Sequence, residues 1–375
     1  MDKRVILSVA GAGKTYYICH TINPCKKNLI LAFTNENIHN IRKELLDAYG
    51  RVPELTNVMT FDSFVYRYLL KPYEPSILQH FGCSDFISCG ITTIEPPKQR
   101  IKSVQGKMVP NKKYIPKDRF GHYISMQRQY YCATLAELIL QIKNSRESLV
   151  NRAALSMNLF YDQVLIDEFQ DFREYDYDLI VGLAKKLNNL TLVGDYYQHS
   201  VSALNNSGKP FENRKGVVGY DEFLEGLKKQ GFSVDTETLK KSRRCSPDVC
   251  EYVKCKLKID IESNGDNVGS VIWADDNAVE IIENQNILKL VIMDAAKYNF
   301  WAMNWSYSKG DTVDNACVIL TEKFEDIDAE SFSIKEISIS TINRLYVAMT
   351  RTKGDLYLIK HSTFKKLKSL YLKKN

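Results

Sequence analysis

A short glycine-containing segment near the start of the chain constrains the fold more than any other feature. Residues 8–15, with the sequence SVAGAGKT, directly follow the apolar run VIL at residues 5–7. Such a run predicts a buried strand, and the glycines after it allow the chain to turn sharply into a helix. This order is typical of a phosphate-binding loop. An ordinary strand-to-helix turn is the alternative, because Ser8 stands where the full pattern has its first glycine.

The residues of this loop have the chemistry that a nucleoside triphosphate needs. Glycine lets the backbone approach phosphate groups without an intervening Cβ atom, and the exposed N–H groups at a helix start attract negative charge. A lysine reaches the outer phosphates, and a threonine hydroxyl serves as a ligand of Mg²⁺. The candidate residues for binding ATP are Gly11, Ala12, Gly13, Lys14 and Thr15.

A second candidate site follows another short apolar run. Residues 164–166, VLI, predict a buried parallel strand that ends in Asp167 and Glu168. Asp167 is a candidate to hold Mg²⁺ through its water shell, and Glu168 is a candidate general base for the water that attacks the γ-phosphate. The alternative is a pair of acidic residues in an exposed turn, which fits poorly with the apolar Phe169 that follows.

A third predicted strand, residues 190–193, leads into the segment GDYYQ at residues 194–198. The glycine permits a tight exit from the strand. The side-chain amide of Gln198 can hydrogen-bond both the γ-phosphate and a neighbouring group. We therefore expect Gln198 to act as a sensor of the bound nucleotide.

The overall pattern predicts an α/β protein built on a parallel sheet. Beyond the phosphate loop, strands are predicted at residues 28–33 and 57–60, with a helix at 36–49 between them. Alternating strands and helices with polar residues at the strand exits are typical of a doubly wound sheet that binds ligands at its C-terminal edge. From about residue 70 to residue 152 a series of prolines interrupts this pattern, which predicts an inserted subdomain.

Composition adds the size and the distribution of charge. The chain has 375 residues, and its 44% hydrophobic content is enough for the cores of two or three globular domains. The formal net charge of +6 is unevenly placed, because residues 98–119 contain eight lysines and arginines and one acidic residue, Asp118. This basic segment is either a solvated loop or a contact surface for nucleic-acid phosphates. Interleaved polar and aromatic residues favour the second interpretation.

Cysteine spacing and hydropathy predict the compartment. The nine cysteines include no C-x-x-C pair, so we expect free thiols in a reducing environment rather than a metal cluster. No segment approaches the roughly 18 consecutive apolar residues of a membrane span. We therefore expect an intracellular, cytoplasmic protein without a membrane partner.

Several of these segments, in this order, resemble the motifs of the superfamily 1 helicases, specifically the UvrD/Rep/PcrA-like branch. Residues 10–15 are similar to the first motif and residues 31–35, LAFTN, to the second. Residues 60–64, TFDSF, are similar to a T-F-H-S-x segment in which Asp62 replaces the histidine. Residues 166–171, IDEFQD, are close to the D-E-x-Q-D box, the most specific single match.

The second half of the chain carries further matches. Residues 239–246, LKKSRRCS, resemble L-x-x-N-Y-R-S, a likeness that makes Arg244 a γ-phosphate arginine. Residues 308–310, SKG, fit the A-K-G motif. Residues 344–351, RLYVAMTR, resemble R-x-x-Y-V-A-x-T-R, which makes Arg351 the second arginine finger.

The resemblance implies an α/β fold with two RecA-like parallel-sheet P-loop motor domains and a small inserted subdomain. The first motor domain, 1A, would comprise residues 1–69 and 152–219, with a 1B-like subdomain inserted at 70–151. The second motor domain, 2A, would comprise residues 220–375. ATP and Mg²⁺ would bind at the cleft between the motor domains, with the two arginines contributed by the second domain.

The resemblance also implies further binding residues. Arg243 stands where the family often has a tyrosine stacked on adenine, and a guanidinium can also stack on a base. Gly310, in the A-K-G match, is a further nucleotide-binding candidate. The implied contacts with a single nucleic-acid strand are Phe33, Thr34, Asn35, Thr60, Phe61 and Lys309. For each of the aromatic residues, core packing is the alternative.

Departures from the family pattern define the alternative functions. The short stretch 245–308 lacks the large accessory 2B domain of longer relatives, so we expect a compact motor. Thr312 replaces the family's ribose-binding glutamate. This replacement resembles the pattern of helicases from RNA viruses. The expected function is ATP-dependent translocation on, or unwinding of, single-stranded DNA, 3′ to 5′. An RNA-directed viral-type helicase, and an ATPase that gates a partner nuclease or a replication or repair protein, are the alternatives.

Overall fold

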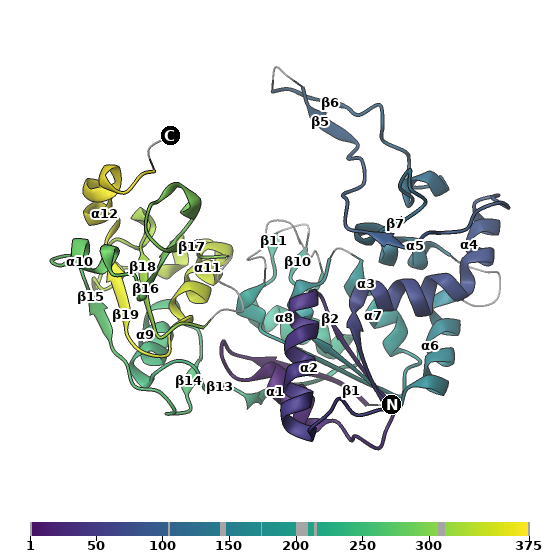
Figure 1. The fold of residues 1–375 in the computed structure, drawn as a ribbon, viewed down its shortest axis with the longest axis horizontal. Helices are drawn as coiled ribbons and strands as arrows, with labels where there is room; N and C mark the ends of the chain where they lie inside the picture. Colours follow the sequence, from purple (N-terminus) through teal and green to yellow (C-terminus); the bar gives the residue numbers. More distant parts are fainter. Residues whose placement is uncertain are drawn as a thin grey trace. The chain divides into compact units, whose positions relative to one another are not determined.

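The structure is a computed structural model, and it describes residues 2–103, 106–142, 148–173, 175–199, 209–213, 216–306 and 312–373. It has the mixed α/β class that the sequence predicts (Figure 1). One sheet has six strands, in the order β12 (Ser233–Leu239), β1 (Asp2–Ser8), β9 (Asn189–Gly194), β8 (Gln163–Asp167), β2 (Asn28–Ala32) and β3 (Thr56–Thr60). Another has five, in the order β15 (Val271–Trp273), β19 (Leu356–Ile359), β18 (Asn315–Ile319), β16 (Ile287–Val291) and β17 (Ala302–Asn304).

Tertiary contacts divide the chain into two compact units. Unit 1 comprises Met1–Arg4, Ile18–Glu168 and Phe172–Leu192. Unit 2 comprises Val5–Tyr17, Phe169–Asp171 and Val193–Asn375. The segment that carries the candidate phosphate loop therefore belongs to the same unit as the C-terminal half of the chain.

The parallel strands of unit 1 form in register at the predicted positions. Ile30 of β2 pairs with Val58 of β3 on one side and with Leu165 of β8 on the other. All residues of β2 are buried, as expected for a strand whose two faces are both covered. The helices that accompany these strands are α2 (Asn35–Tyr49), α6 (Leu149–Phe160) and α7 (Asp176–Ala184).

Sequence signals fix both ends of α2. The hydroxyl of Thr34 accepts a hydrogen bond from the N–H of Asn37 and caps the helix start. The helix ends at Gly50, whose φ of 70° lies in the left-handed region that glycine adopts without strain. This helix directly follows β2, so its cap fixes the path of the chain at the C-terminal end of that strand.

The segment that follows β3 contains several short elements. Its helices are α3 (Phe61–Phe64), α4 (Glu74–His80) and α5 (Leu135–Gln141), and its short strands are β4 (Ile91–Thr92) with β7 (Tyr130–Tyr131) and β5 (Arg100–Lys102) with β6 (Met108–Pro110). The antiparallel β5–β6 hairpin projects from the rest of unit 1 (Figure 1) and is exposed along its length. It carries part of the basic segment identified in the sequence.

The five-stranded sheet of unit 2 is parallel throughout. The helices of this unit are α8 (Tyr220–Lys229), α9 (Pro247–Leu257), α10 (Ala278–Glu283), α11 (Ile339–Met349) and α12 (His361–Leu367), and two further strand pairs are β10 (Glu212–Asn213) with β11 (Gly216–Val217) and β13 (Lys241–Ser242) with β14 (Glu262–Ser263). Helix α1 (Lys14–Thr21) begins at the loop lysine. Across the described ranges, no helix combines the length and the hydropathy needed to cross a bilayer.

Candidate nucleotide-binding site

The glycine segment forms a loop between the end of β1 at Ser8 and the start of α1 at Lys14. Gly11 has a φ of 71° and Gly13 a φ of 84°, both in the left-handed region that side chains rarely adopt. The backbone therefore requires glycine at both positions. The lysine that the sequence assigns to phosphate binding lies at the first position of the helix, where backbone N–H groups have no partner within the helix.

The segment that carries Arg244 packs directly on this loop. The N–H of Arg243 donates a hydrogen bond to the carbonyl of Gly11, with an N–O distance of 3.0 Å. A Cβ atom at Gly11 would lie 2.5 Å from the Cβ of Arg244 and 2.9 Å from the hydroxyl oxygen of Ser242. Gly11 is thus needed for close approach as well as for its φ angle, and the arginine lies beside the candidate phosphate loop.

Helix α11 reaches the same loop through Tyr346. The backbone N–H of Ala10 donates to the Tyr346 hydroxyl at 2.7 Å, and that hydroxyl donates to a carboxylate oxygen of Asp195 at 3.2 Å. Burial, with a further contribution from the Asp195 charge, raises the pKa of Tyr346 well above its ordinary value. The hydroxyl therefore keeps its proton and makes both hydrogen bonds at physiological pH.

Asp195 is the centre of a buried polar network next to the loop. Its carboxylate accepts hydrogen bonds from the side-chain amide of Gln198 and the N–H of Tyr197, each at 2.9 Å. Its own N–H donates to the side-chain oxygen of Gln170 at 3.0 Å. Asp195, Gln198 and Gln170 are all buried. The predicted sensor residue, Gln198, is thereby held in one orientation by a carboxylate that also holds Tyr346.

The two candidate arginines are brought close to each other. A guanidinium nitrogen of Arg244 donates to the carbonyl of Thr350, which is the residue before Arg351, at 3.1 Å. Arg351 is buried, and its Nε donates to the carbonyl of Val347 at 2.8 Å. Arg243 is exposed, and its guanidinium lies over the ring of Tyr16 at 4.9 Å from the ring centre. Unit 2 thus gathers the loop, three arginines and the Asp195 network.

The two acidic candidates follow β8 in unit 1. Asp167 is buried, and its carboxylate accepts a hydrogen bond from the N–H of Glu168 at 2.9 Å. Glu168 has a φ of 55°, which is uncommon for any residue other than glycine. Strained backbone of this kind concentrates at functional sites, so this angle supports a role for Glu168 beyond packing.

The candidate strand-binding residues of unit 1 lie at adjacent strand ends. Ala32 pairs with Thr60, so the C-terminal ends of β2 and β3 are side by side. Thr34 and Asn35 are exposed there. Phe33 is half-buried and stacks on Phe61, with ring centres 5.3 Å apart.

Phe61 itself is only 1% exposed and packs with Phe64 and Phe172. This burial favours core packing over contact with a nucleic-acid strand. The hydroxyl of Thr60 accepts from the N–H of Ser63 and caps α3. Lys309 and Gly310 lie outside the described residues.

One feature of unit 1 has no signal in the sequence motifs. Asp62, which stands where the helicase motif has a histidine, forms an ion pair with Arg173. Arg173 also pairs with Asp176 at 3.1 Å. Asp176 is buried, and this burial raises its pKa although Arg173 opposes the shift. Asp62, Arg173 and Asp176 thus form an ion-pair network that links α3 to α7.

Tyr346, Asp195, Gln170 and Ser242 are site residues that reasoning from the sequence did not assign. Each lies within a segment that the motifs had already marked. Gln170 and Asp195 follow the strands β8 and β9, so their positions at strand exits were the available signal.

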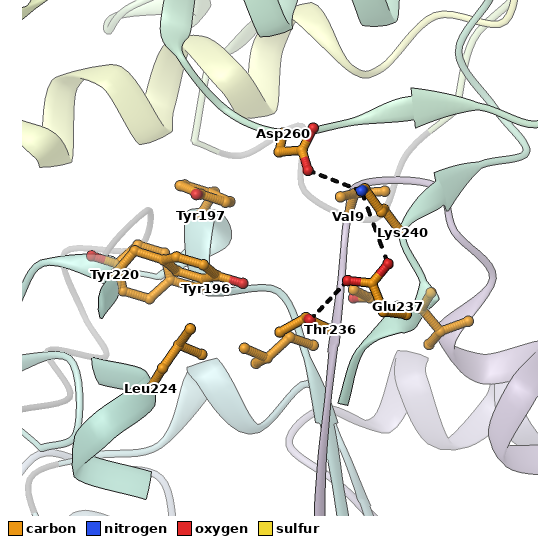
Figure 2. Close-up of a pocket in the computed structure, with 12 residues that line it drawn as sticks. Val9, Tyr196, Tyr197, Tyr220, Leu224, Thr236, Glu237, Lys240 and Asp260 are labelled. Carbon is orange, nitrogen blue, oxygen red and sulfur yellow. Dashed lines mark hydrogen bonds and ion pairs between the residues drawn. The ribbon is translucent and has the colours of Figure 1, made fainter. Parts of the chain in front are cut away.

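Figure 2 shows a cavity of about 180 Å³ beside the start of the loop. Tyr196, Tyr197 and Tyr220 line one side, and Val9 and the ion pair of Lys240 with Asp260 lie across from them. Ligand sites are typically about 300–1,000 Å³, so this cavity is too small for a whole nucleotide. We assign it no ligand.

Comparison with known proteins gives one family and several distant structures. A family model described as an AAA domain matches residues 2–203. No curated protein is significantly similar in sequence. The solved PRRSV helicase is 14% identical, with a TM-score of 0.42, over 99% of this chain and 55% of that chain. An arterivirus nonstructural protein 10 helicase in complex with DNA is 13% identical, with a TM-score of 0.43, over 97% and 63%. The chain thus spans 55–63% of the length of these two structures.

Proposed function

This chain belongs to the AAA domain family, and from that premise we propose that it is an ATP-hydrolysing superfamily 1 motor that translocates on, or unwinds, single-stranded DNA. The family match includes the phosphate loop and the segment that ends β8. We propose that the chain forms a pair of RecA-like motor domains with the boundaries inferred from the sequence.

One observation carries the proposal. The loop of residues 10–13 is contacted by the two segments that carry the arginine candidates, through Gly11 against Arg244 and through Ala10 against Tyr346. Catalysis of phosphoryl transfer depends on positioning and on cations placed around the γ-phosphate, supplied by Lys, Mg²⁺ and an arginine finger. A phosphate loop contacted by Arg244 and by the segment that leads to Arg351 supports a site for this chemistry.

The residues present fit ATP. Gly11 and Gly13 have the left-handed angles expected of a phosphate-binding loop, and Lys14 at the helix start would bind the outer phosphates. Arg244 and Arg351 would stabilise charge on the transferred phosphoryl group. Gln198 would donate a hydrogen bond to the γ-phosphate and so sense the bound nucleotide. Arg243, stacked on Tyr16, would offer a flat face to the base, and Gly310 is retained as a further nucleotide contact.

Mg²⁺ is proposed as the metal ion of this site, with the ligands inferred from the sequence. Thr15 and Asp167 would hold it, and it would neutralise phosphate charge. No group of three or more metal-binding side chains is found among the residues that the structure describes. The remaining ligands would therefore be phosphate oxygens and water, which is usual for Mg²⁺. Glu168 would accept a proton from the attacking water.

Single-stranded DNA is proposed as the polymer that activates hydrolysis. The support is the cluster of exposed polar residues and a half-buried aromatic ring at the ends of β2 and β3, together with the basic β5–β6 hairpin. Phe33, Thr34, Asn35 and Thr60 would contact the strand in a sequence-tolerant way, with Lys309 from the second motor domain. The direction of travel is proposed as 3′ to 5′, and a nuclease or a replication or repair protein as a possible functional partner.

The test is the rate of ATP hydrolysis by the purified chain with poly-dT, with poly-U and with no polymer. We expect stimulation of at least tenfold by poly-dT. Stimulation by poly-U alone would assign the motor to RNA, and no stimulation by either polymer would contradict a translocase. Displacement of an oligonucleotide from duplexes with 3′ or 5′ tails then measures polarity, and lack of displacement despite strong stimulation would mean translocation without unwinding.

A further inference from the structure

A buried lysine in the five-stranded sheet of unit 2 has no part in the proposed ATP site. Lys289 is the central residue of β16, and its whole surface is buried. On either side of it in the strand, Ile287 and Val291 belong to the hydrophobic core of this sheet. Its cross-strand neighbours, Cys317 on β18 and Ala302 on β17, are also uncharged side chains of that core. A cation at this position is unusual and unfavourable.

The ammonium group of Lys289 has little compensation from the protein. Its Nζ donates a hydrogen bond to the carbonyl of Asn284 at 2.6 Å. The ring of Phe300 lies 5.9 Å away and offers a weak cation–π contact. Within the described ranges, no carboxylate lies within ion-pair distance of Nζ. Burial lowers the pKa of Lys289 below its ordinary value, as expected for an ammonium without a counter-ion.

A cavity of about 440 Å³ opens next to this lysine, within the usual size range of ligand sites. Phe300, Trp301 and Tyr371 supply aromatic walls, and Trp301 is 48% exposed. Glu283 is the acidic residue of the lining, and its carboxylate accepts a hydrogen bond from the Tyr371 hydroxyl at 3.2 Å. The lining also includes Gln285 and Asn299, so the cavity combines ring faces and polar residues with one cation and one carboxylate.

From this arrangement we propose that the cavity binds a planar aromatic ring that carries one anionic group, such as a mononucleotide, with Lys289 as the counter-ion. Lys289 lines the cavity but is 0% exposed, so its ammonium would turn toward a bound ligand. A phosphate or carboxylate would then accept the hydrogen bonds that the Asn284 carbonyl does not take. The ring would stack on Phe300 or Trp301, and Glu283 would accept a hydrogen bond from an exocyclic amino group. The lining shares no residue with the ATP site proposed above.

The same chemistry has two sources, a free mononucleotide or the 5′-phosphorylated end of a strand. Calorimetry and tryptophan fluorescence with AMP, on a Lys14→Ala background that removes phosphate binding at the loop, test the first. Comparison of 5′-phosphorylated and 5′-hydroxyl oligo-dT on the same background tests the second. Because the readout is binding and not ATP turnover, failure of the proposed motor function would leave this test interpretable.

Lys289→Met is the decisive variant, with the exposed Lys335→Met as its matched control. We expect Lys289→Met to weaken AMP binding, or to abolish the preference for a 5′-phosphate, by at least tenfold. Its thermal midpoint should be equal to or higher than that of the parent, because methionine fills the same space without a buried charge. The control should change neither property.

The proposal fails if neither AMP nor a 5′-phosphate is bound, or if Lys289→Met binds as well as its parent. Inorganic phosphate alone is the remaining probe. We expect it to bind at least tenfold more weakly than AMP, and equal affinity would overturn the role given to the aromatic walls.

Discussion

The hydroxyl of Tyr346 accepts a hydrogen bond from the backbone N–H of Ala10 at 2.7 Å, which joins helix α11 to the loop between β1 and α1. The same hydroxyl donates to Asp195. Tyr346→Phe would leave both buried groups without this partner. We expect a loss of about 1–3 kcal/mol in the free energy of unfolding and a clear fall in kcat for ATP. Urea unfolding and steady-state ATPase rates measure the two effects.

A matched variant separates this effect from loss of any tyrosine hydroxyl. Tyr357 is half-buried, and its hydroxyl donates to Asp355 at 3.4 Å. Tyr357→Phe should change unfolding by less than about 0.5 kcal/mol, the usual range away from buried networks. An equal loss of unfolding free energy in both variants would mean that the hydrogen bond to Ala10 does not stabilise the protein more than the half-buried Tyr357 hydroxyl does.

Alkaline pH gives an independent test of Tyr346. An unfolded tyrosine loses its proton near pH 10, whereas the native residue keeps it because its pKa is raised. The native state then binds more protons than the unfolded state, so stability falls as pH rises above about 10. Urea midpoints between pH 8 and pH 11 should fall more steeply for the parent than for Tyr346→Phe. Parallel curves would contradict the raised pKa.

Gly11→Ala should abolish nucleotide binding, because the new methyl group would meet Arg244 and Ser242. Gly50→Ala is the matched control. Its φ of 70° imposes the same backbone strain, of order 1 kcal/mol, but nothing lies within 4 Å of the new atom. We expect both variants to be destabilised and only Gly11→Ala to lose binding of a fluorescent ATP analogue. Retained binding in Gly11→Ala would show that the Arg244 segment is not part of the pocket.

Glu168→Gln and Lys14→Ala should separate turnover from binding. Removal of a general base lowers the rate by about 10²–10⁴-fold, so Glu168→Gln should bind ATP like the parent and turn it over far more slowly. Lys14→Ala should lose most of the binding. Equilibrium binding and single-turnover hydrolysis distinguish the two, and equal loss of binding in both would mean that Glu168 is not the base.

Arg173→Met should destabilise unit 1 strongly, because it leaves the buried carboxylate of Asp176 without its ion-pair partner. Loss of one partner of a buried pair costs about 3–5 kcal/mol. The pKa of Asp176 should then rise further, so the native state would hold a proton that the unfolded state has released. The variant should therefore be more stable at pH 5 than at pH 8. The exposed Arg51→Met, whose side chain is 74% accessible, should keep the pH dependence of the parent.

Substitution of Lys112 and Lys113 tests whether the basic segment that includes the β5–β6 hairpin contacts nucleic-acid phosphates. Both lysines are exposed. Each phosphate contact contributes about −0.7 to the slope of log affinity against log salt for a single strand. Lys112→Ala with Lys113→Ala should make that slope shallower for oligo-dT, whereas the exposed pair Lys228→Ala with Lys229→Ala should not. Identical slopes in both double variants would mean that the basic segment is only a solvated loop.

Local structure could be predicted from the sequence, because it depends on neighbouring residues. The apolar runs at 28–33, 164–166 and 190–193 correspond to β2, β8 and β9, and the glycines of the loop have the left-handed angles that the pattern requires. These features follow from periodicity and from the backbone geometry of glycine.

Contacts between distant segments could not be predicted in the same way. The bond between Ala10 and Tyr346 spans 336 positions, and the pairing of Asp62 with Arg173 spans 111. Lys289 shows the limit most clearly, since a lysine within an apolar strand is expected to reach water and this one does not. Such partners are chosen by tertiary packing, which a local pattern does not encode.

The hydrogen bond between Ala10 and helix α11 offers a way to measure opening of the loop. Any rearrangement that draws helix α11 away from the loop must break the hydrogen bond to Tyr346 and release the Ala10 amide to solvent. That amide proton is then a built-in reporter of loop opening, readable by deuterium uptake with no label attached. Its exchange should slow when a non-hydrolysable ATP analogue holds the loop closed and quicken during turnover, so its protection would report how often the loop opens.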